Sequence, residues 1–171
     1  LIASGELLPR GAQIVPGITP IPKYMRAKGI VKGPSGAPRH GEPKDVIHDV
    51  VVKTQPIGAN EYRAVPLYLG GTYNIIWAAL GIPVSVFENH DEDVHIPGSG
   101  AVGLVVEVGE EAAKQGRVRV GDVVFSFPFE TDPLSPTGGA DLSFASPQIT
   151  GFETPWGMAA EFYTGQVQNA F

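Results

Sequence analysis

Cysteine is absent from this 171-residue sequence, and so is any hydrophobic run long enough to cross a membrane. Without cysteine the chain forms no disulfide bond and no thiolate zinc site. Cations are also scarce, because 12 Lys and Arg stand against 18 Asp and Glu and give a net charge of −6. This balance disfavours nucleic acid as the main partner. Since the first residues also lack a signal-peptide pattern, we expect a cytoplasmic protein that binds neither membranes nor nucleic acid.

Glycine and proline are plentiful, with 22 and 16 residues, and this leaves little room for long helices. Hydrophobic residues make up 43% of the chain, which is enough for one domain with a substantial core. Residues 95–127 have the pattern of a β-sheet, with Val- and Leu-rich runs at 101–108 and 123–127 and a short alternating run at 118–120. The polar stretch at 110–116 is too short for a crossover helix. We therefore predict a mainly β fold, a partly open antiparallel barrel with a few short helices.

Further elements are expected before residue 95. Strands are predicted near 28–32, at 46–54 and at 62–69, where Pro66 indicates a sheet edge or a bulge. Two glycines then lead into a short helix that reaches Leu80 and ends at Gly81. Residues 1–22 are rich in Pro and Gly without periodicity, so we expect an extended lead-in to a domain at 23–171. The chain begins with Leu rather than Met, which indicates a piece of a longer protein.

The residues Gly98 to Gly103 match the dinucleotide-binding pattern G-x-G-x-x-G letter for letter. That chemistry needs a strand before the glycines and a helix after them, so that the pyrophosphate meets the N-terminus of the helix. Here an acidic loop precedes the glycines, and the β-favouring run Leu104-Val105-Val106 follows them. We interpret the match as a false positive.

Two charged stretches suggest binding sites and leave simpler interpretations open. Residues 88–95 combine acids with His90 and His95, but their spacing fits no known metal-ligand pattern, and we predict no metal site. Residues 23–44 hold half of the cations against the single acid Glu42: Lys23, Arg26, Lys28, Lys32, Arg39 and Lys44. Asp45 follows directly. This stretch is either a phosphate-binding face, as for coenzyme A, or a solvated strand and turn.

Three residues are candidates for chemistry on their local pattern alone. Tyr73 and Asn74 stand where a strand gives way to a helix, a common place for active-site side chains, and in the simpler interpretation Asn74 only caps that helix. Glu153 follows Phe152 and precedes Trp156 in a turn bounded by Gly and Pro. A carboxylate buried among aromatic rings suits proton transfer, whereas an exposed loop carboxylate does not.

These residues resemble a known family. Residues 95–127 are similar to the GroES-like catalytic domain of medium-chain dehydrogenase/reductases, and the likeness is strongest to crotonyl-CoA carboxylase/reductase and to the acrylyl-CoA reductase of propionyl-CoA synthase. Four stretches carry it: Gly5-Glu6-Leu7 with Pro9, Tyr73-Asn74 with residues 77–81 and 83–85, residues 96–103, and residues 151–155. The second and fourth are the specific ones. The resemblance covers nearly the whole chain.

The resemblance implies an NADPH-dependent 2-enoyl-CoA reductase that adds hydride to the β-carbon and a proton to the α-carbon. Family members bind NADPH on a separate Rossmann cofactor domain, form homo-oligomers, and place the active site in the cleft between the domains. This chain then corresponds to the substrate side alone, an incomplete enzyme that is inactive without the cofactor domain. Asn74, Phe152 and Glu153 match positions that hold carbon dioxide in carboxylating members. Without carboxylation, Glu153 is our proton source, and Tyr73 is a weaker choice.

The departures from the family pattern keep other functions open. Thr72 stands where Asn is expected, Gly100 replaces an Asp, and the loop at 133–144 is altered, so simple reduction is favoured over the alternative, reductive carboxylation. Zinc dehydrogenases of the superfamily carry a His-Glu pair where Ser99 and Gly100 stand, so no catalytic zinc is expected. The alternative from another class is a non-catalytic GroES-like binding or assembly module.

Overall fold

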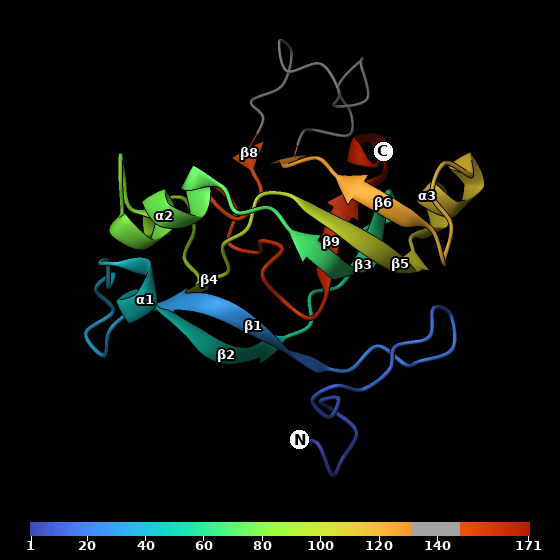
Figure 1. Cartoon of the computed structure of the whole chain (residues 1–171), viewed down its shortest axis with the longest axis horizontal. Helices are drawn as coiled ribbons and strands as arrows, with labels where there is room; N and C mark the ends of the chain where they lie inside the picture. The colour runs from blue at the N-terminus through green and yellow to red at the C-terminus, as the bar shows by residue number, and fades with distance from the viewer. Residues whose placement is uncertain (131–147) are drawn as a thin grey trace.

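A computed structural model describes residues 1–130 and 148–171 and shows two main antiparallel sheets (Figure 1). One sheet has the order β2-β1-β4, with β1 at Tyr24–Val31, β2 at Ile47–Lys53 and β4 at Val94–His95. The other has the order β6-β5-β3-β9, with β3 at Glu61–Leu69, β5 at Ala101–Val108, β6 at Val123–Ser126 and β9 at Tyr163–Gln166. The short strands β7, at Phe129–Glu130, and β8, at Gln148–Ile149, pair separately. The predicted mainly β fold is confirmed.

Within the described residues, three short α-helices and two 3-10 turns connect the strands. They are α1 at Pro43–Val46, α2 at Tyr73–Leu80, α3 at Glu110–Gln115, η1 at Val86–Glu88 and η2 at Val167–Asn169. Gly81 ends α2 in the left-handed conformation, with φ at 70°, as its sequence position predicts. No helix in the described part of the chain is long and apolar enough to span a membrane.

The two sheets meet along a partly open seam. Strand β9 pairs with β3 only as far as Ala64, opposite Tyr163. The chain just before β9 instead joins β1 of the other sheet, where Ala160 pairs with Ala27 and the Lys28 amide donates to the Ala159 carbonyl at 2.8 Å. Residues 65–69 of β3 therefore have β5 on one side and no paired strand on the other within the described residues. Pro66 lies here beside a register shift, so both features predicted from it are present.

One predicted strand is wrong. Residues 118–120 alternate in sequence but form a turn, because the Asp122 carboxylate accepts the Arg119 amide hydrogen at 2.8 Å and the Asp122 amide donates to the Arg119 carbonyl. Local side-chain to backbone bonds of this kind compete with strand pairing. The altered loop expected at 133–144 lies outside the described residues.

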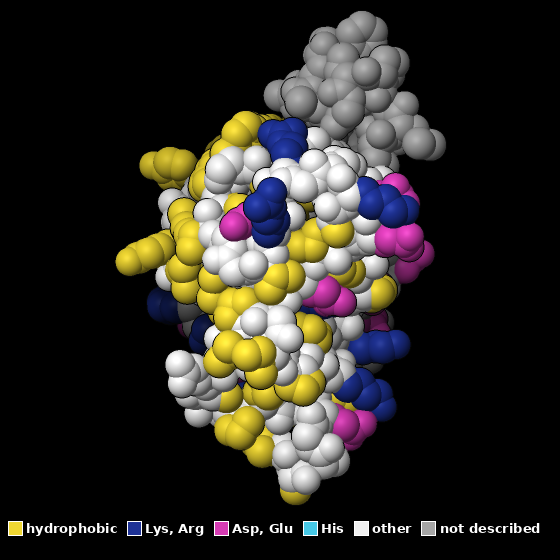
Figure 2. Space-filling model, turned by 90° about the vertical axis from the view of Figure 1, so that its right-hand side faces the viewer, with side chains coloured by type: hydrophobic (Ala, Val, Ile, Leu, Met, Phe, Trp, Pro, Cys, Tyr) yellow, Lys and Arg dark blue, Asp and Glu magenta, His cyan; other side chains and the backbone are white. Residues whose placement is uncertain are grey.

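The surface divides by side-chain type. Figure 2 shows hydrophobic side chains gathered along one side of the visible face, while most charged side chains line the other. Large hydrophobic residues are exposed on the edge strand β6 and next to it, namely Val123, Phe125, Phe127 and Phe171. The C-terminal residue pairs with this edge, because the Phe125 and Phe171 backbones exchange hydrogen bonds at 2.7 and 3.0 Å.

The last glycine of the dinucleotide-like pattern is explained by core packing. A Cβ at Gly103 would lie 2.9 Å from ring carbons of Tyr163. That ring is fixed by a buried chain of hydroxyl groups, in which Ser126 Oγ lies 2.6 Å from both the Tyr62 and the Tyr163 oxygen. The glycines lead directly into β5 rather than a helix, which confirms that the pattern is not a pyrophosphate cradle.

We expect Gly103→Ala to lower the free energy of unfolding by about 1 to 3 kcal/mol, because a methyl group there displaces a buried tyrosine ring. Gly100→Ala is the matched control from the same pattern. Its Cβ would meet only the Ser126 carbonyl oxygen, at an ordinary 3.9 Å, and should leave stability nearly unchanged. Urea unfolding of both variants measures the difference. Equal stability of the two variants would contradict this packing argument.

Candidate functional site

The first turn of α2 carries two of the predicted site residues. Asn74 does not cap the helix, because Thr72 occupies the cap position, and its side-chain amide instead donates to the buried Ser99 hydroxyl at 3.3 Å. Tyr73 is 73% exposed and stacks on Trp77. The Thr72 hydroxyl is buried and has no hydrogen-bond partner. The turn thus offers polar groups close to Asn74, while Tyr73 lies on the surface.

Phe152 and Glu153 stand in a tight turn that follows β8. The Phe152 and Glu153 amides both donate to the Ile149 carbonyl, and the Glu153 carboxylate accepts the Ile149 amide hydrogen at 2.7 Å. Phe152 is buried in one hydrophobic cluster with Ala78 and Ala79 of α2. Packing therefore joins this turn to the helix that carries Asn74, and the carboxylate is fixed by the turn's own backbone.

Trp156 belongs to a different part of the core. It packs with the Met25 and Ile96 cluster, whereas Phe152 packs with the α2 cluster. The two aromatic side chains therefore belong to different clusters of the core, and Glu153 between them is half-buried. No hydrogen bond between Glu153 and Asn74 is present in the described chain. The turn of Glu153 and helix α2 are connected by the packing of Phe152 and by backbone contacts at three glycines.

That connection is a junction of glycine backbones. A Cβ at Gly151 would lie 2.8 Å from Gly157 Cα and 2.9 Å from the Gly98 nitrogen. The Met158 amide donates to the Gly98 carbonyl at 2.9 Å, and the Gly157 amide to Ile96 at 2.8 Å. Because Ser99 follows Gly98 and Phe152 follows Gly151, the Asn74–Ser99 hydrogen bond is held beside the turn that carries Glu153.

A pair of histidines, which the sequence offered only as unlikely metal ligands, supports the same turn. His95 is fully buried, and its Nε2 donates to the Gly151 carbonyl at 3.0 Å. Its Nδ1 consequently accepts from His90 Nε2 at 3.0 Å, with the two rings stacked. Burial lowers the pKa of His95 to about 4. Burial also lowers the pKa of His90, and the positive charge of Lys32 lowers it further. His95 is thus a neutral hydrogen-bond donor to the site.

Metal and phosphate binding receive little support from the remaining residues. No group of three acidic or histidine side chains converges in the part of the chain that the structure describes. Five of the six cations of the basic stretch have carboxylate partners: Lys23 with Glu6, Arg26 with Glu161, Lys28 with Asp49, Lys32 with Asp93, and Lys44 with Asp45. These pairs favour the structural interpretation of that stretch.

Sequence reasoning missed Ser99, Gly151 and the role of His95. No sequence signal marked His95, because histidine is of intermediate burial in proteins and the burial of its neighbours is known only from the structure. Its partner was not predictable, because Gly151 lies 56 residues further along the chain. Glycine at 151 has φ of 68°, a conformation that other residues rarely adopt.

We expect the free energy of unfolding to fall as the pH is lowered from 7 to 5. The folded pKa of His95 is about 4 and the ordinary value is 6.5, so the unfolded state binds the proton more readily in this window. The loss at pH 5 is about 2 kcal/mol from this group. His95→Gln should flatten the dependence, and His48→Gln, at an exposed position, should not. Urea unfolding at several pH values measures both, and an unchanged slope in His95→Gln would refute the assignment.

The chain is similar in sequence and in fold to known proteins. No family model matches the chain. Crotonyl-CoA carboxylase/reductase of Cereibacter sphaeroides is 36% identical over 156 residues, which are 90% of this chain and 34% of that protein. The solved crotonyl-CoA carboxylase/reductase AntE in complex with NADP superposes with a TM-score of 0.81 at 26% identity, over 97% of this chain and 40% of the other. An NAD-dependent alcohol dehydrogenase shares the fold at 20% identity, with a TM-score of 0.68 over 86% of this chain and 39% of its own.

The chain therefore spans about a third of the length of the curated relative that it matches. The similarity extends over both glycine-bearing segments and the helix of Asn74, because it covers nearly all of this chain. The fold is shared with alcohol dehydrogenases, and the sequence with enoyl-CoA carboxylase/reductases. In sequence this chain is therefore homologous to about a third of crotonyl-CoA carboxylase/reductase, and in fold it is similar to an alcohol dehydrogenase, which is consistent with a GroES-like domain of the medium-chain dehydrogenase/reductases.

Proposed function

We propose that this chain is the thioester side of an NADPH-dependent 2-enoyl-CoA reductase of acrylyl-CoA or crotonyl-CoA type. The observation that carries the proposal is the 36% identity to a crotonyl-CoA carboxylase/reductase over a chain that places Asn74 and the Glu153 turn at one junction. A cytoplasmic location and a homo-oligomeric enzyme belong to the same proposal.

NADPH, when bound, supplies a hydride to the β-carbon of the unsaturated thioester. The described residues of this chain do not fit a dinucleotide, because Tyr163 fills the space beside Gly103 and the glycines enter a strand. In the proposal a Rossmann domain of the kind found in the superfamily holds the cofactor, corresponding to the part of the relatives that this chain does not span. The active site then lies between the two domains.

Hydride addition leaves an enolate, whose α-carbon must take up a proton. One oxygen of Glu153 accepts the Ile149 amide hydrogen, and the other has no hydrogen-bond partner among the described residues. In the proposal this second oxygen, or a water that it orders, delivers the proton. Asn74 keeps one amide hydrogen beyond its bond to Ser99, and this donor stabilises the negative charge of the enolate.

A second candidate function is reductive carboxylation, in which carbon dioxide rather than a proton is added to the α-carbon. The names of the relatives favour it, since they are carboxylase/reductases. Thr72 and Gly100 depart from the pattern of carboxylating members, and for this reason we propose protonation as the main outcome. In either reaction Asn74, Phe152 and Glu153 have a part, and Tyr73 is a surface residue next to Asn74 in the chain.

In the full-length protein that carries this chain, we expect Glu153→Gln to lower kcat for crotonyl-CoA reduction by about 100-fold, because proton delivery to the α-carbon is lost. Glu88→Gln, at an exposed position outside the site, is the control. NADPH oxidation measures the rate, and mass spectrometry with and without bicarbonate identifies the product.

Unchanged rate and product in Glu153→Gln would remove Glu153 from the chemistry. Efficient carboxylation by the parent protein would select the second candidate. Absence of any NADPH-dependent turnover of enoyl-CoA would leave the binding or assembly module as the better description.

A further inference from the structure

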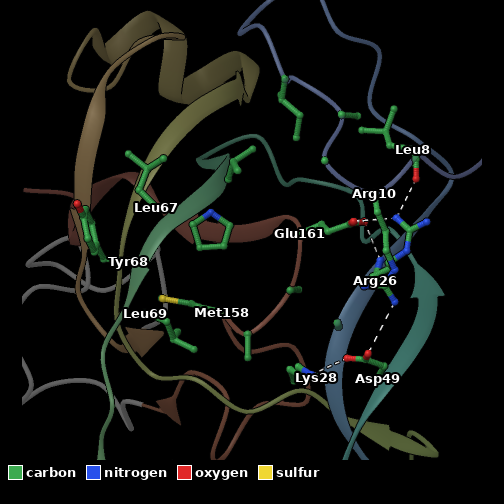
Figure 3. A pocket seen from close by; sticks show the side chains of 18 of the residues that line it. Leu8, Arg10, Arg26, Lys28, Asp49, Leu67, Tyr68, Leu69, Met158 and Glu161 are labelled. Atoms are coloured by element: carbon green, nitrogen blue, oxygen red, sulfur yellow. Dashed lines mark hydrogen bonds and ion pairs between the residues drawn. The ribbon is translucent and has the colours of Figure 1, made fainter.

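A cavity of about 550 Å³ lies in the open seam between the two sheets (Figure 3). Leu67, Tyr68, Leu69 and Met158 lie on one side of it, and Figure 3 shows ion pairs of Arg26 and Lys28 on the other. The N-terminal residues 8–12 form a further part of its wall. The volume falls in the range of small-molecule sites, about 300 to 1,000 Å³.

The floor of the cavity is an unpaired strand edge. Residues 65–69 of β3 all line the cavity, and within the described residues β9 leaves this edge after Ala64. A strand edge presents backbone N–H and C=O groups that pair with another extended chain. An extended ligand that carries amide groups along an apolar chain is complementary to such an edge.

One end of the cavity adjoins the candidate site. Leu69 Cδ1 lies 3.1 Å from the position of a Cβ at Gly98, and the Met158 amide donates to the Gly98 carbonyl. The next residue, Ser99, accepts the Asn74 amide hydrogen. A ligand that lies along β3 therefore reaches the Asn74–Ser99 pair at the Leu69 end.

The polar wall carries an excess of positive charge. Arg26 is neutralised by Glu161 at 2.9 Å and also donates to the Leu8 carbonyl. Asp49 is shared, because Lys28 holds it at 2.6 Å and Arg10 approaches only to 3.7 Å. Three cations thus face two carboxylates in a chain whose net charge is −6. Arg10, with 74% of its side chain exposed, is the cation left to bind an anion.

We propose that this seam binds the pantetheine arm of the acyl thioester, a deepening that rests on the proposed function. The two amides of the arm pair with the free edge of β3, its methylene groups pack on Leu67 and Leu69, and a phosphate at its far end meets Arg10. The thioester end lies toward Gly98, Ser99 and Asn74.

The test is an NMR titration of the 171-residue chain with three probes: crotonyl-CoA, S-crotonyl-pantetheine, which lacks phosphate, and adenosine 3′,5′-bisphosphate, which lacks the arm. We expect the first two to shift the backbone amide signals of residues 65–69, apart from Pro66, and the third to leave them unchanged. Crotonyl-CoA at about 5 mM detects binding with a Kd near 1 mM. Absence of binding at that concentration would overturn the proposal. So would the same shifts with the bisphosphate alone.

Two surface variants separate the parts of the site. Leu67→Trp fills the cavity and should abolish the binding of both acyl probes, whereas Val123→Trp, on an exposed position of β6 outside the cavity, should not. Arg10→Glu should lower the affinity for crotonyl-CoA about three- to tenfold and leave the affinity for S-crotonyl-pantetheine unchanged, because only crotonyl-CoA carries phosphate. Arg119→Glu is the matched charge control. Parent-like affinity in Leu67→Trp would refute the seam as the site.

The outcome is separable from that of the proposed function. If the full-length protein turns over crotonyl-CoA with NADPH but Leu67→Trp keeps the parent KM, the seam is refuted and the reductase stands. If the chain binds both acyl probes at residues 65–69 while the full-length protein reduces none, the seam stands and the reductase is refuted. Circular dichroism of each variant confirms that the sheets are retained.

Discussion

Close packing of backbone on backbone at Gly98, Gly151 and Gly157 is the constraint on which the site depends. At each of these positions a Cβ would meet neighbouring backbone atoms at less than 3.0 Å. The resulting contact brings two segments about fifty residues apart in sequence side by side, and the Met158 and Gly157 amides hold them together. The buried His95 adds a hydrogen bond to the Gly151 carbonyl from a third element. Side chains of any size at the junction would separate Asn74 from the Glu153 turn.

The open seam of the barrel follows from the path that the chain takes after this glycine junction. After the glycine junction the chain first pairs with β1, at Ala160, and only then with β3, from Tyr163 onward. The segment from Ala160 to β9 therefore pairs with both sheets, but it does not cover residues 65–69 of β3. The ion pair of Arg26 with Glu161 fixes the change of partner, because the Glu161 carboxylate also accepts the Arg26 amide hydrogen. The cavity forms because this one segment pairs first with β1 and then with only part of β3.

Charge has a mainly structural part in this arrangement. The basic stretch 23–44 stands out in the sequence, yet its side chains are engaged by carboxylates from the N-terminal segment, from β2 and from the loop before β9. Exposed pairs of this kind contribute about 0 to 1 kcal/mol each. Their value lies in fixing which segments neighbour β1. Where two cations share Asp49, positive charge remains for a ligand.

The sequence by itself determined the β-rich fold, the ends of α2, the bulge at Pro66 and the rejection of the glycine pattern as a nucleotide site, because these follow from local propensity and turn chemistry. Local patterns indicated Asn74 and Glu153 as candidates for chemistry, and the resemblance to a family added Phe152. The tertiary structure alone decided that Asn74 binds Ser99, that Trp156 and Phe152 belong to different core clusters, that His95 supports Gly151 and that residues 118–120 form a turn. The long-range contacts among these lie outside sequence reasoning because their partners are 25 to 56 residues apart, and no local period records which backbone another segment will meet.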